Sequence, residues 1–405
     1  MRNKMSSNSV NEPNLRFSEF RNDASWKKLD LASVASFVNE KVPFDQILLK
    51  DYVSTENILP NFSGVITASN KPSSGSGTKY KENDILVSNI RPYLKKIWRS
   101  NRVGCASNDI IVIRNKDTLT DLFISSLLAS DNFIDYIMKG AQGVKMPRGD
   151  IDLIKKYPVW FPPNKAEQQK IADCLTSLGD LISGEEQKLE ALQRHKKGLV
   201  QELLPAAGET LPKRRFPEFQ DEPEWEIRPL GDCAASIVAS GDLNTEYFSK
   251  ATSDQHIYPV YSNAVENDGL YGYYSASKYP SNSITITARG NIGTAFLREK
   301  PFMGIGRLIV VACRNGIEPY FLKECWNFRA LIPKEVTSVP QLTAITAKSV
   351  MLPIPGWREQ KRIANLLYSV DRLVTSQREK LIGLRQHKKA LLQQLFPAVG
   401  EAQHG

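Results

Sequence analysis

Two long stretches of the chain carry apolar residues at alternating steps of four and three, which is the spacing of a coiled-coil seam. They cover residues 167–205 and 359–397, align without a gap, and are identical at 17 of 39 positions. Polar residues interrupt the seam at matching places, for example at Lys196 and Lys388. The apolar seam residues are Ile171, Leu175, Leu178, Ile182, Leu189, Leu192 and Leu199, and in the second copy Ile363, Leu367, Val370, Val374, Leu381, Leu384 and Leu391. The pattern predicts two long helices that bury these faces.

The ends of both predicted helices are marked in the sequence. Asn164 and Glu167 stand at the spacing of a capping box directly after two prolines, and Pro205 and Pro397 end the helical stretches. A helix of this length spans about 55 Å at about 1.5 Å per residue. We expect the two helices to bury their seams against each other.

The segment in front of each helix has a different pattern. Residues 26–160 and 225–352 contain short apolar or alternating runs, such as DILVSNI and SITITARGNIGTAFL, which are separated by Gly, Pro, Asn and Ser. Only the stretch from Leu119 to Met138 has helical spacing. The short motif RFSEF at residues 16–20 returns as RFPEF at residues 215–219. The chain is therefore built twice, each time as a strand-rich mixed α/β block followed by a helix.

The duplication predicts an α+β fold. We expect two mixed α/β domains joined by two long coiled-coil helices, and a pseudo-twofold axis relating the two halves would make these helices antiparallel. Such an axis would place one front block at each end of the helix pair. Heptads alone favour a plainer alternative, a structural spacer or scaffold without a ligand of its own.

Composition adds a charge argument. Among 405 residues, 53 are Lys or Arg and 44 are Asp or Glu, which gives a net charge of +9 and makes a polyanionic partner plausible. The five cysteines are odd in number and scattered, as in reduced cytoplasmic proteins. The polar first residues give no sign of a signal peptide, and no run of 18 apolar residues is present, so we expect a cytoplasmic protein.

Basic, amide and tyrosine side chains gather in one strand-turn segment of each front block. Arginine suits guanine, asparagine suits adenine, and lysine suits phosphate, so this chemistry fits a DNA groove. Backbone geometry in a hairpin turn and a charged strand edge explain the same residues equally simply. The candidates are Asn89, Arg91, Tyr93, Lys95 and Lys96 in the first block, Lys145 and Arg148 in a loop of the same block, and Arg289, Asn291 and Arg298 in the second.

Two HKK triplets, at residues 195–197 and 387–389, also suggest phosphate binding, although a charge run on a helix is usually its solvated face. Motifs for catalysis are missing. The sequence contains no G-x-x-x-x-G-K-[ST], no N-P-P-[FY] and no H-E-x-x-H, and it has only four histidines. We predict a protein that binds without catalysing a reaction, with no catalytic residue and no metal site.

The order of these features resembles the specificity subunit of type I restriction-modification systems. The resemblance rests on the openings WKKL and WEIRPL and on a Pro-rich strand that leads into E-Q-x-x-I-A, in PVWFPPNKAEQQKIA and in LPIPGWREQKRIA. It covers nearly the whole chain. It implies that the front blocks are target recognition domains, each reading one half of a bipartite, asymmetric site on double-stranded DNA.

The resemblance also implies partners and domain limits. The helix pair would set the spacer between the half-sites and dock two modification subunits, which methylate adenine with S-adenosylmethionine. Added restriction subunits would use ATP and Mg for translocation and cleavage, and this chain would bind none of these cofactors and no membrane. A self-contained nuclease or methyltransferase is a further alternative. The expected parts are a polar tail (1–14), recognition domain 1 (15–161), a central conserved helix (162–210), recognition domain 2 (211–353) and a C-terminal conserved helix (354–405).

Overall fold

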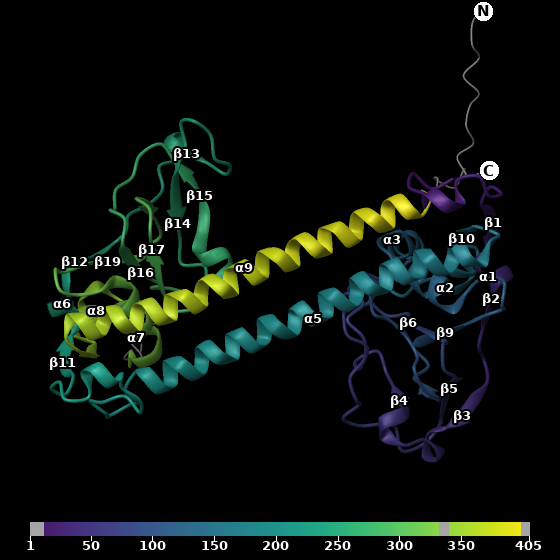
Figure 1. The fold of residues 1–405 in the computed structure, drawn as a ribbon, viewed down its shortest axis with the longest axis horizontal. Coiled ribbons are helices and arrows are strands. Elements are labelled where there is room, and N and C mark those ends of the chain that lie inside the picture. The colour runs from purple at the N-terminus through teal and green to yellow at the C-terminus, as the bar shows by residue number, and fades with distance from the viewer. Residues whose placement is uncertain (1–11, 332–339, 398–405) are drawn as a thin grey trace, which may run out of the picture. The chain divides into compact units, whose positions relative to one another are not determined.

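The computed structural model describes residues 12–331 and 340–397, so most of the predicted polar tail and residues 398–405 lie outside the described residues. The chain forms two compact units, one up to Glu185 and from Lys380 onwards, the other from Glu186 to Glu379. Each unit holds one recognition domain and a part of both long helices, α5 (Lys165–Leu203) and α9 (Trp357–Leu395), drawn in teal and yellow in Figure 1. The domain limits expected from the sequence stay a prediction.

The two long helices run antiparallel, as the sequence predicts. In the first unit, Ile171 and Leu175 near the start of α5 share a core with Leu395 at the end of α9. In the second unit, Leu203 at the end of α5 shares a core with Leu367 near the start of α9. Every predicted apolar seam residue is buried or half-buried. The helix pair is therefore an antiparallel coiled coil that also forms one wall of each recognition domain.

The first recognition domain contains one two-stranded and two four-stranded sheets. The two-stranded sheet pairs β1 (Lys27–Asp30) with β10 (Pro158–Phe161). The larger four-stranded sheet has the order β2 (Ala35–Phe37), β9 (Ile110–Asn115), β6 (Ile85–Ser88) and β7 (Ile97–Arg99). The smaller one has the order β3 (Lys41–Pro43), β5 (Ser76–Tyr80), β8 (Gly104–Ala106) and β4 (Tyr52–Val53). The helices are α1 (Leu31–Val34), α2 (Asp121–Leu128), α3 (Asp131–Lys139) and α4 (Ile151–Lys155).

The second recognition domain repeats this plan with two differences, one in its smaller sheet and one in its helices. Its two-stranded sheet pairs β11 (Glu226–Pro229) with β20 (Met351–Ile354). Its larger sheet, β12 (Ala234–Ala239), β19 (Ile309–Cys313), β16 (Ser283–Ile286) and β17 (Ala295–Arg298), matches the larger sheet of the first domain in order. The smaller sheet has the order β13 (Phe248–Ser249), β15 (Leu270–Tyr274), β14 (Tyr258–Tyr261) and β18 (Met303–Gly304), in which different strands are central. The helices are α6 (Leu230–Cys233), α7 (Pro319–Arg329) and α8 (Ala344–Ser349).

The larger sheets are buried on both faces, which explains their continuous apolar runs. In β6, Ile85 and Val87 point into the main core beside the helices, whereas Leu86 points into a second core on the opposite face. In β16, Ile284 and Ile286 likewise point into the main core of the second domain. Because the two strands hold the same place in matching sheets, the connections that follow them are equivalent positions of the repeat.

A buried carboxylate explains why both copies keep the RF-x-EF motif and the E-Q helix start. Glu167 is fully buried and accepts hydrogen bonds from Arg16 Nε and Nη2, both at 2.8 Å, and from Trp26 Nε1 at 3.3 Å. In the second copy, Arg215 Nε and Nη2 donate to Glu359 at 2.9 and 2.8 Å. The motif therefore fastens the start of each recognition domain to the start of its helix.

The structure corrects the predicted capping box. Asn164 Oδ1 does accept a hydrogen bond from the Ala166 amide at 2.9 Å, but the Glu167 carboxylate binds Arg16 and Trp26 instead of completing the box. The neighbouring Gln168 accepts from the Thr120 amide through Oε1 at 2.8 Å and donates to the Pro162 carbonyl at 2.9 Å. A spacing rule cannot detect a partner that lies far away in the sequence.

We predict that the same substitution has different effects at the two tryptophans that open the recognition domains. Trp26→Phe removes the hydrogen bond to Glu167, whereas Trp225 Nε1 is buried and finds no acceptor among the residues that the structure describes. Both substitutions lose the same side-chain volume, so Trp26→Phe should destabilise by about 1.5 kcal/mol more than Trp225→Phe. Urea unfolding of both variants measures the difference, and equal losses would contradict the hydrogen-bond assignment.

Candidate nucleic-acid interface

The two basic clusters of the first domain lie together, although more than 40 residues separate them in the sequence. The connection between β6 and β7 meets the loop before α4 through two backbone hydrogen bonds. The Arg91 amide donates to the Pro147 carbonyl at 2.8 Å, and the Gly149 amide donates to the Asn89 carbonyl at 3.1 Å. We call these two segments together, residues 89–96 and 141–149, the first reading surface.

Four of the predicted residues on this surface are exposed: Arg91, Tyr93, Lys145 and Arg148. Arg91 adopts a left-handed backbone conformation with φ of 50°, which residues other than glycine rarely adopt. Arg148 Nη2 lies 3.1 Å from Asp109 Oδ1, and its side chain remains 62% exposed. The first reading surface therefore presents cations and one aromatic ring to solvent.

The other three predicted residues of this cluster already have protein contacts or are half-buried. Lys96 Nζ donates to the Thr55 carbonyl at 2.7 Å, and Asn89 is half-buried with its Oδ1 unpaired among the described residues. Lys95 Nζ lies 2.6 Å from Asp131 Oδ1. Burial favours the neutral acid, but Lys95 and Lys389 together outweigh it and hold the pKa of Asp131 below its ordinary value. Lys95 therefore serves more to position the turn than to bind a phosphate.

The second domain builds an equivalent surface from the β16–β17 connection. The Leu342 amide donates to the Ala288 carbonyl at 2.9 Å, which is the counterpart of the bond between Gly149 and Asn89. Arg289 and Asn291 are exposed, and Arg289 Nη2 donates to Gln341 Oε1 at 3.0 Å. We call residues 287–294 and the neighbouring residues 340–342 the second reading surface.

Arg298 does not belong to this surface. It is 4% exposed, its guanidinium lies 3.6 Å from the ring centroid of Tyr261, and its Nε donates to Thr285 Oγ1 at 2.8 Å. Burial lowers the pKa of Arg298 to about 10. The residue lies on a strand, where alternate side chains point inward, and it takes an inward position. We therefore remove Arg298 from the set of candidate DNA contacts.

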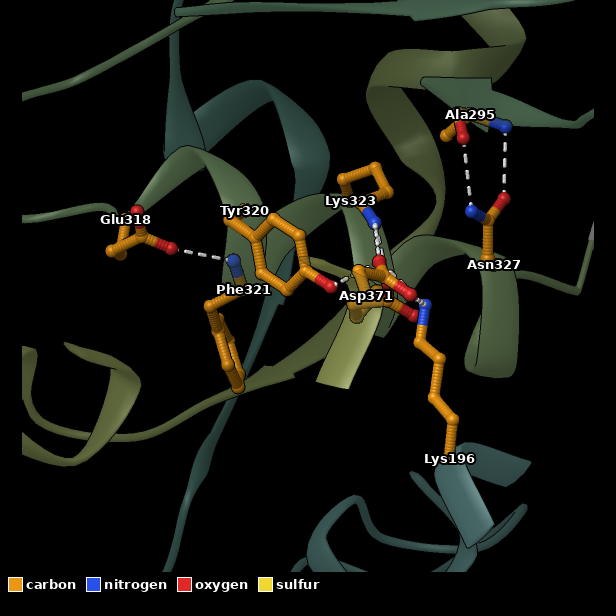
Figure 2. A network of polar contacts seen from close by, with 9 residues as sticks. Lys196, Ala295, Glu318, Tyr320, Phe321, Lys323, Asn327 and Asp371 are labelled. Carbon is orange, nitrogen blue, oxygen red and sulfur yellow. Dashed lines mark hydrogen bonds and ion pairs between the residues drawn. The ribbon is translucent and has the colours of Figure 1, made fainter. Parts of the chain in front are cut away.

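One lysine of each HKK triplet forms an ion pair with the protein. In the second unit, Lys196 Nζ lies 2.7 Å from Asp371 Oδ1 (Figure 2). The same Nζ lies 2.8 Å from Glu324 Oε1. In the first unit, Lys389 Nζ lies 3.5 Å from Asp131 Oδ2, the carboxylate that also binds Lys95. Each triplet thus supplies a lysine that ties a long helix to the recognition domain in its unit.

Sequence reasoning missed the acidic and amide residues that organise the surfaces. Asp109 and Asp131 hold Arg148 and Lys95, and Gln341 holds Arg289. Only a search for acidic residues flanking the basic turns could have suggested the first two. Among the described residues, no group of three or more His, Cys, Asp or Glu could hold a metal ion, and no helix there is long and apolar enough to cross a membrane.

Comparison with known proteins gives a consistent result. The chain is 26% identical over 283 residues to a putative type I specificity subunit of Mycoplasma pneumoniae, which covers 68% of this chain and 71% of the relative. It is 22% identical over 347 residues to a type I restriction enzyme specificity subunit of Methanocaldococcus jannaschii, covering 78% of each.

Two solved structures share the fold. The crystal structure of a type I restriction-modification S subunit from M. genitalium matches with a TM-score of 0.67 and 15% identity, over 96% of this chain and all of that chain. A structure from work on complex assembly and conformational transition of the type I R-M system matches with a TM-score of 0.53 and 17% identity, over 91% of this chain and 96% of that chain.

The duplication seen in the sequence and in the two units also appears in the family comparison. The family described as "Type I restriction modification DNA specificity domain" matches residues 25–194 and again residues 222–386. Each match begins at or just before the tryptophan that opens a recognition domain and ends within a long helix. The chain therefore belongs to the family of type I restriction modification DNA specificity domains and carries that domain twice.

Proposed function

We propose that this protein is the DNA-specificity subunit of a type I restriction-modification complex, and that each recognition domain reads one half of a bipartite, asymmetric DNA site. The observation that carries the proposal is the pair of reading surfaces, which lie at equivalent places in matching sheets. One presents Arg91, Tyr93, Lys145 and Arg148, and the other presents Arg289 and Asn291. Since equivalent places carry different side chains, the two half-sites differ in sequence.

The coiled coil fits the second part of this role. It sets the spacer between the half-sites and docks two modification subunits, because a twofold repeat offers the same helical surface twice. Adenine methylation with S-adenosylmethionine belongs to those subunits, and ATP- and Mg-dependent cleavage belongs to restriction subunits. This chain contributes sequence recognition and no catalysis. A scaffold protein that does not bind DNA would not explain the two exposed basic turns.

Methylome sequencing of the host, with and without this chain, tests the proposal. We expect a single asymmetric, interrupted methyladenine motif that disappears when the chain is deleted and returns when it is restored. An unchanged methylome would overturn the proposal. Measurable S-adenosylmethionine binding by the isolated chain would instead support the alternative of a self-contained methyltransferase.

Arg289→Ala should relax one half-site only. A bidentate contact from arginine to guanine is worth about 1–3 kcal/mol of discrimination, and Arg289 is exposed on one surface alone. Methylation of a DNA library with both half-sites randomised measures the effect. Arg228→Ala is the control, because that side chain lies on β11 in an ion pair with Glu226, outside the reading surface. Unchanged preference at every position would remove Arg289 from the candidates.

A further inference from the structure

A third turn borders the second reading surface. It runs from Ile305 to Leu308, between β18 and β19, and the Leu308 amide closes it by donating to the Ile305 carbonyl at 3.4 Å. Its two central residues, Gly306 and Arg307, have φ of 70° and 69°. Glycine adopts this left-handed conformation without cost, but arginine does so rarely and under strain. The strained backbone of Arg307 costs local stability. We infer that its exposed side chain has a function for which this cost is tolerated.

Asn263 fastens this turn to the reading surface. Its Nδ2 donates to the Gly306 carbonyl at 2.6 Å, and its Oδ1 accepts a hydrogen bond from the Ala288 amide at 2.6 Å. One half-buried carboxamide therefore bridges the residue before Arg307 and the residue before Arg289. Since the Asn263 side chain binds backbone atoms of both turns, the relative position of the two turns does not depend on the side chains of Arg289 and Arg307.

The side chain of Arg307 is available for a ligand. The residue is exposed, and it forms no ion pair or hydrogen bond with any side chain in the described part of the chain. Arg298, by contrast, is buried against Tyr261, and Arg289 is held by Gln341. A guanidinium presents a planar fork of donors that fits the O6 and N7 acceptors of guanine in the major groove.

The first domain has a turn at the equivalent place, with the opposite charge and without the left-handed backbone conformation. It runs from Ser107 to Ile110, closed by the Ile110 amide donating to the Ser107 carbonyl at 3.0 Å, and it precedes β9 as the other turn precedes β19. Asp109 takes the place of Arg307 in this turn. The Asn89 amide donates to the Asp109 carbonyl at 2.9 Å, so this turn also borders its reading surface. A carboxylate in place of a guanidinium changes which base edge can be contacted.

We propose that Arg307 is a specificity-determining residue that contacts guanine in the half-site read by the second domain, and that Asp109 gives the first domain a different preference at the equivalent position. This inference rests on the proposed function and extends it to a turn that the sequence did not single out. Arg307 and Arg289 then read neighbouring base pairs from two turns that Asn263 keeps in register.

The test is methylation by the assembled complex of a DNA library in which each half-site is randomised in turn. Arg307→Ala should lower the preference for one base pair of the second domain's half-site by roughly 5- to 150-fold, and should leave the other half-site unchanged. Arg307→Lys should keep overall DNA affinity but lose that preference, because an ammonium lacks the bidentate fork. Arg314→Ala is the matched control. Arg307 lies just before β19, whereas Arg314 lies directly after it, at the other end of the strand.

A glycine variant separates recognition from folding. Arg307→Gly relieves the left-handed strain, so its thermal unfolding midpoint should equal or exceed that of the wild type while the base preference is lost. Wild-type preference in Arg307→Ala at every position, or an equal loss on all sequences as expected for a phosphate contact, would overturn the inference. If Arg289→Ala shifts the preference and Arg307→Ala does not, only this inference fails. If the wild-type complex shows no sequence preference, the proposed function itself fails.

Discussion

Replacing Glu324 with alanine is expected to lower the free energy of unfolding by about 3 kcal/mol, because it removes one of the two carboxylates that neutralise Lys196 and Lys323 and leaves Asp371 as their shared counter-charge. Glu324 lies on α7 with a side chain that is 8% exposed. It accepts hydrogen bonds from Lys196 Nζ of α5 at 2.8 Å and from the neighbouring Lys323. Asp371 of α9 binds Lys196 as well and accepts a hydrogen bond from the Tyr320 hydroxyl (Figure 2). The network joins both long helices to the second recognition domain.

Urea unfolding measures this loss. The slope of the free energy of unfolding against urea concentration should be the same in the variant and the wild type. Glu190→Ala is the control, since that carboxylate is 68% exposed and forms an ion pair with Arg194 one turn along the same helix. Exposed pairs of this kind contribute at most about 0.5 kcal/mol. A loss in Glu324→Ala no greater than in the control would show that the network does not hold the helices and the domain together.

The same network fixes the direction of a pH effect. Burial disfavours the charge of Glu324, but Lys323 and Lys196 outweigh it and hold the pKa of Glu324 below its ordinary value. Burial likewise disfavours the charge of Lys196, but Glu324 and Asp371 hold the pKa of Lys196 above its ordinary value. The glutamate's contribution is therefore present above its unfolded pKa and is lost as the pH falls through the lower folded value. The lysine's contribution is lost as the pH rises through the higher folded value. The stability difference between wild type and Glu324→Ala should shrink in acid.

The long helices could be predicted from the sequence because a seam repeats over many turns and is present twice. Their antiparallel pairing was predicted from the family resemblance and from a pseudo-twofold axis between the two halves, since the seam alone does not fix the direction of the helices. Lys196 was visible as a polar interruption of the seam, but its partner Glu324 is 128 positions away and could not be inferred. The matching position of Asp371 in the first copy is Gly179, where Lys388 Nζ lies 3.2 Å from the point that a Cβ would occupy. The network therefore marks a place where the two halves of the repeat differ.

The reading surfaces were only partly predictable. Basic turns can be recognised locally, so Arg91, Arg148 and Arg289 were found as single residues. These residues come together because distant loops meet through backbone hydrogen bonds. Such bonds do not depend on the side chains, so they could not be predicted from the sequence. Arg298 was misplaced because the inward or outward direction of a strand residue depends on strand parity and on what covers each face. Arg307 was missed because its turn has no basic cluster around it.

DNA affinity of the assembled complex is expected to fall steeply with salt, by about 10³ to 10⁵ between 50 and 200 mM if six to ten phosphates are neutralised. Each phosphate contact releases condensed counterions and contributes about −0.9 to the slope of log affinity against log salt concentration. Lys145 is exposed and forms no ion pair with a residue in the described ranges, so it is suited to phosphate. Lys145→Ala should therefore make the slope shallower by about 1 and weaken binding to all sequences equally.

Two comparisons make this result specific. Lys155→Ala should leave the slope unchanged, because Lys155 Nζ is already paired with Asp152 Oδ1 at 2.9 Å and lies on α4, outside residues 89–96 and 141–149. Arg289→Ala should lower affinity mainly for the cognate half-site, since a base contact discriminates between sequences and a phosphate contact does not. A fluorescence anisotropy titration over several salt concentrations measures all three variants in the same complex. A flat salt profile for the wild type would contradict binding through these cationic surfaces.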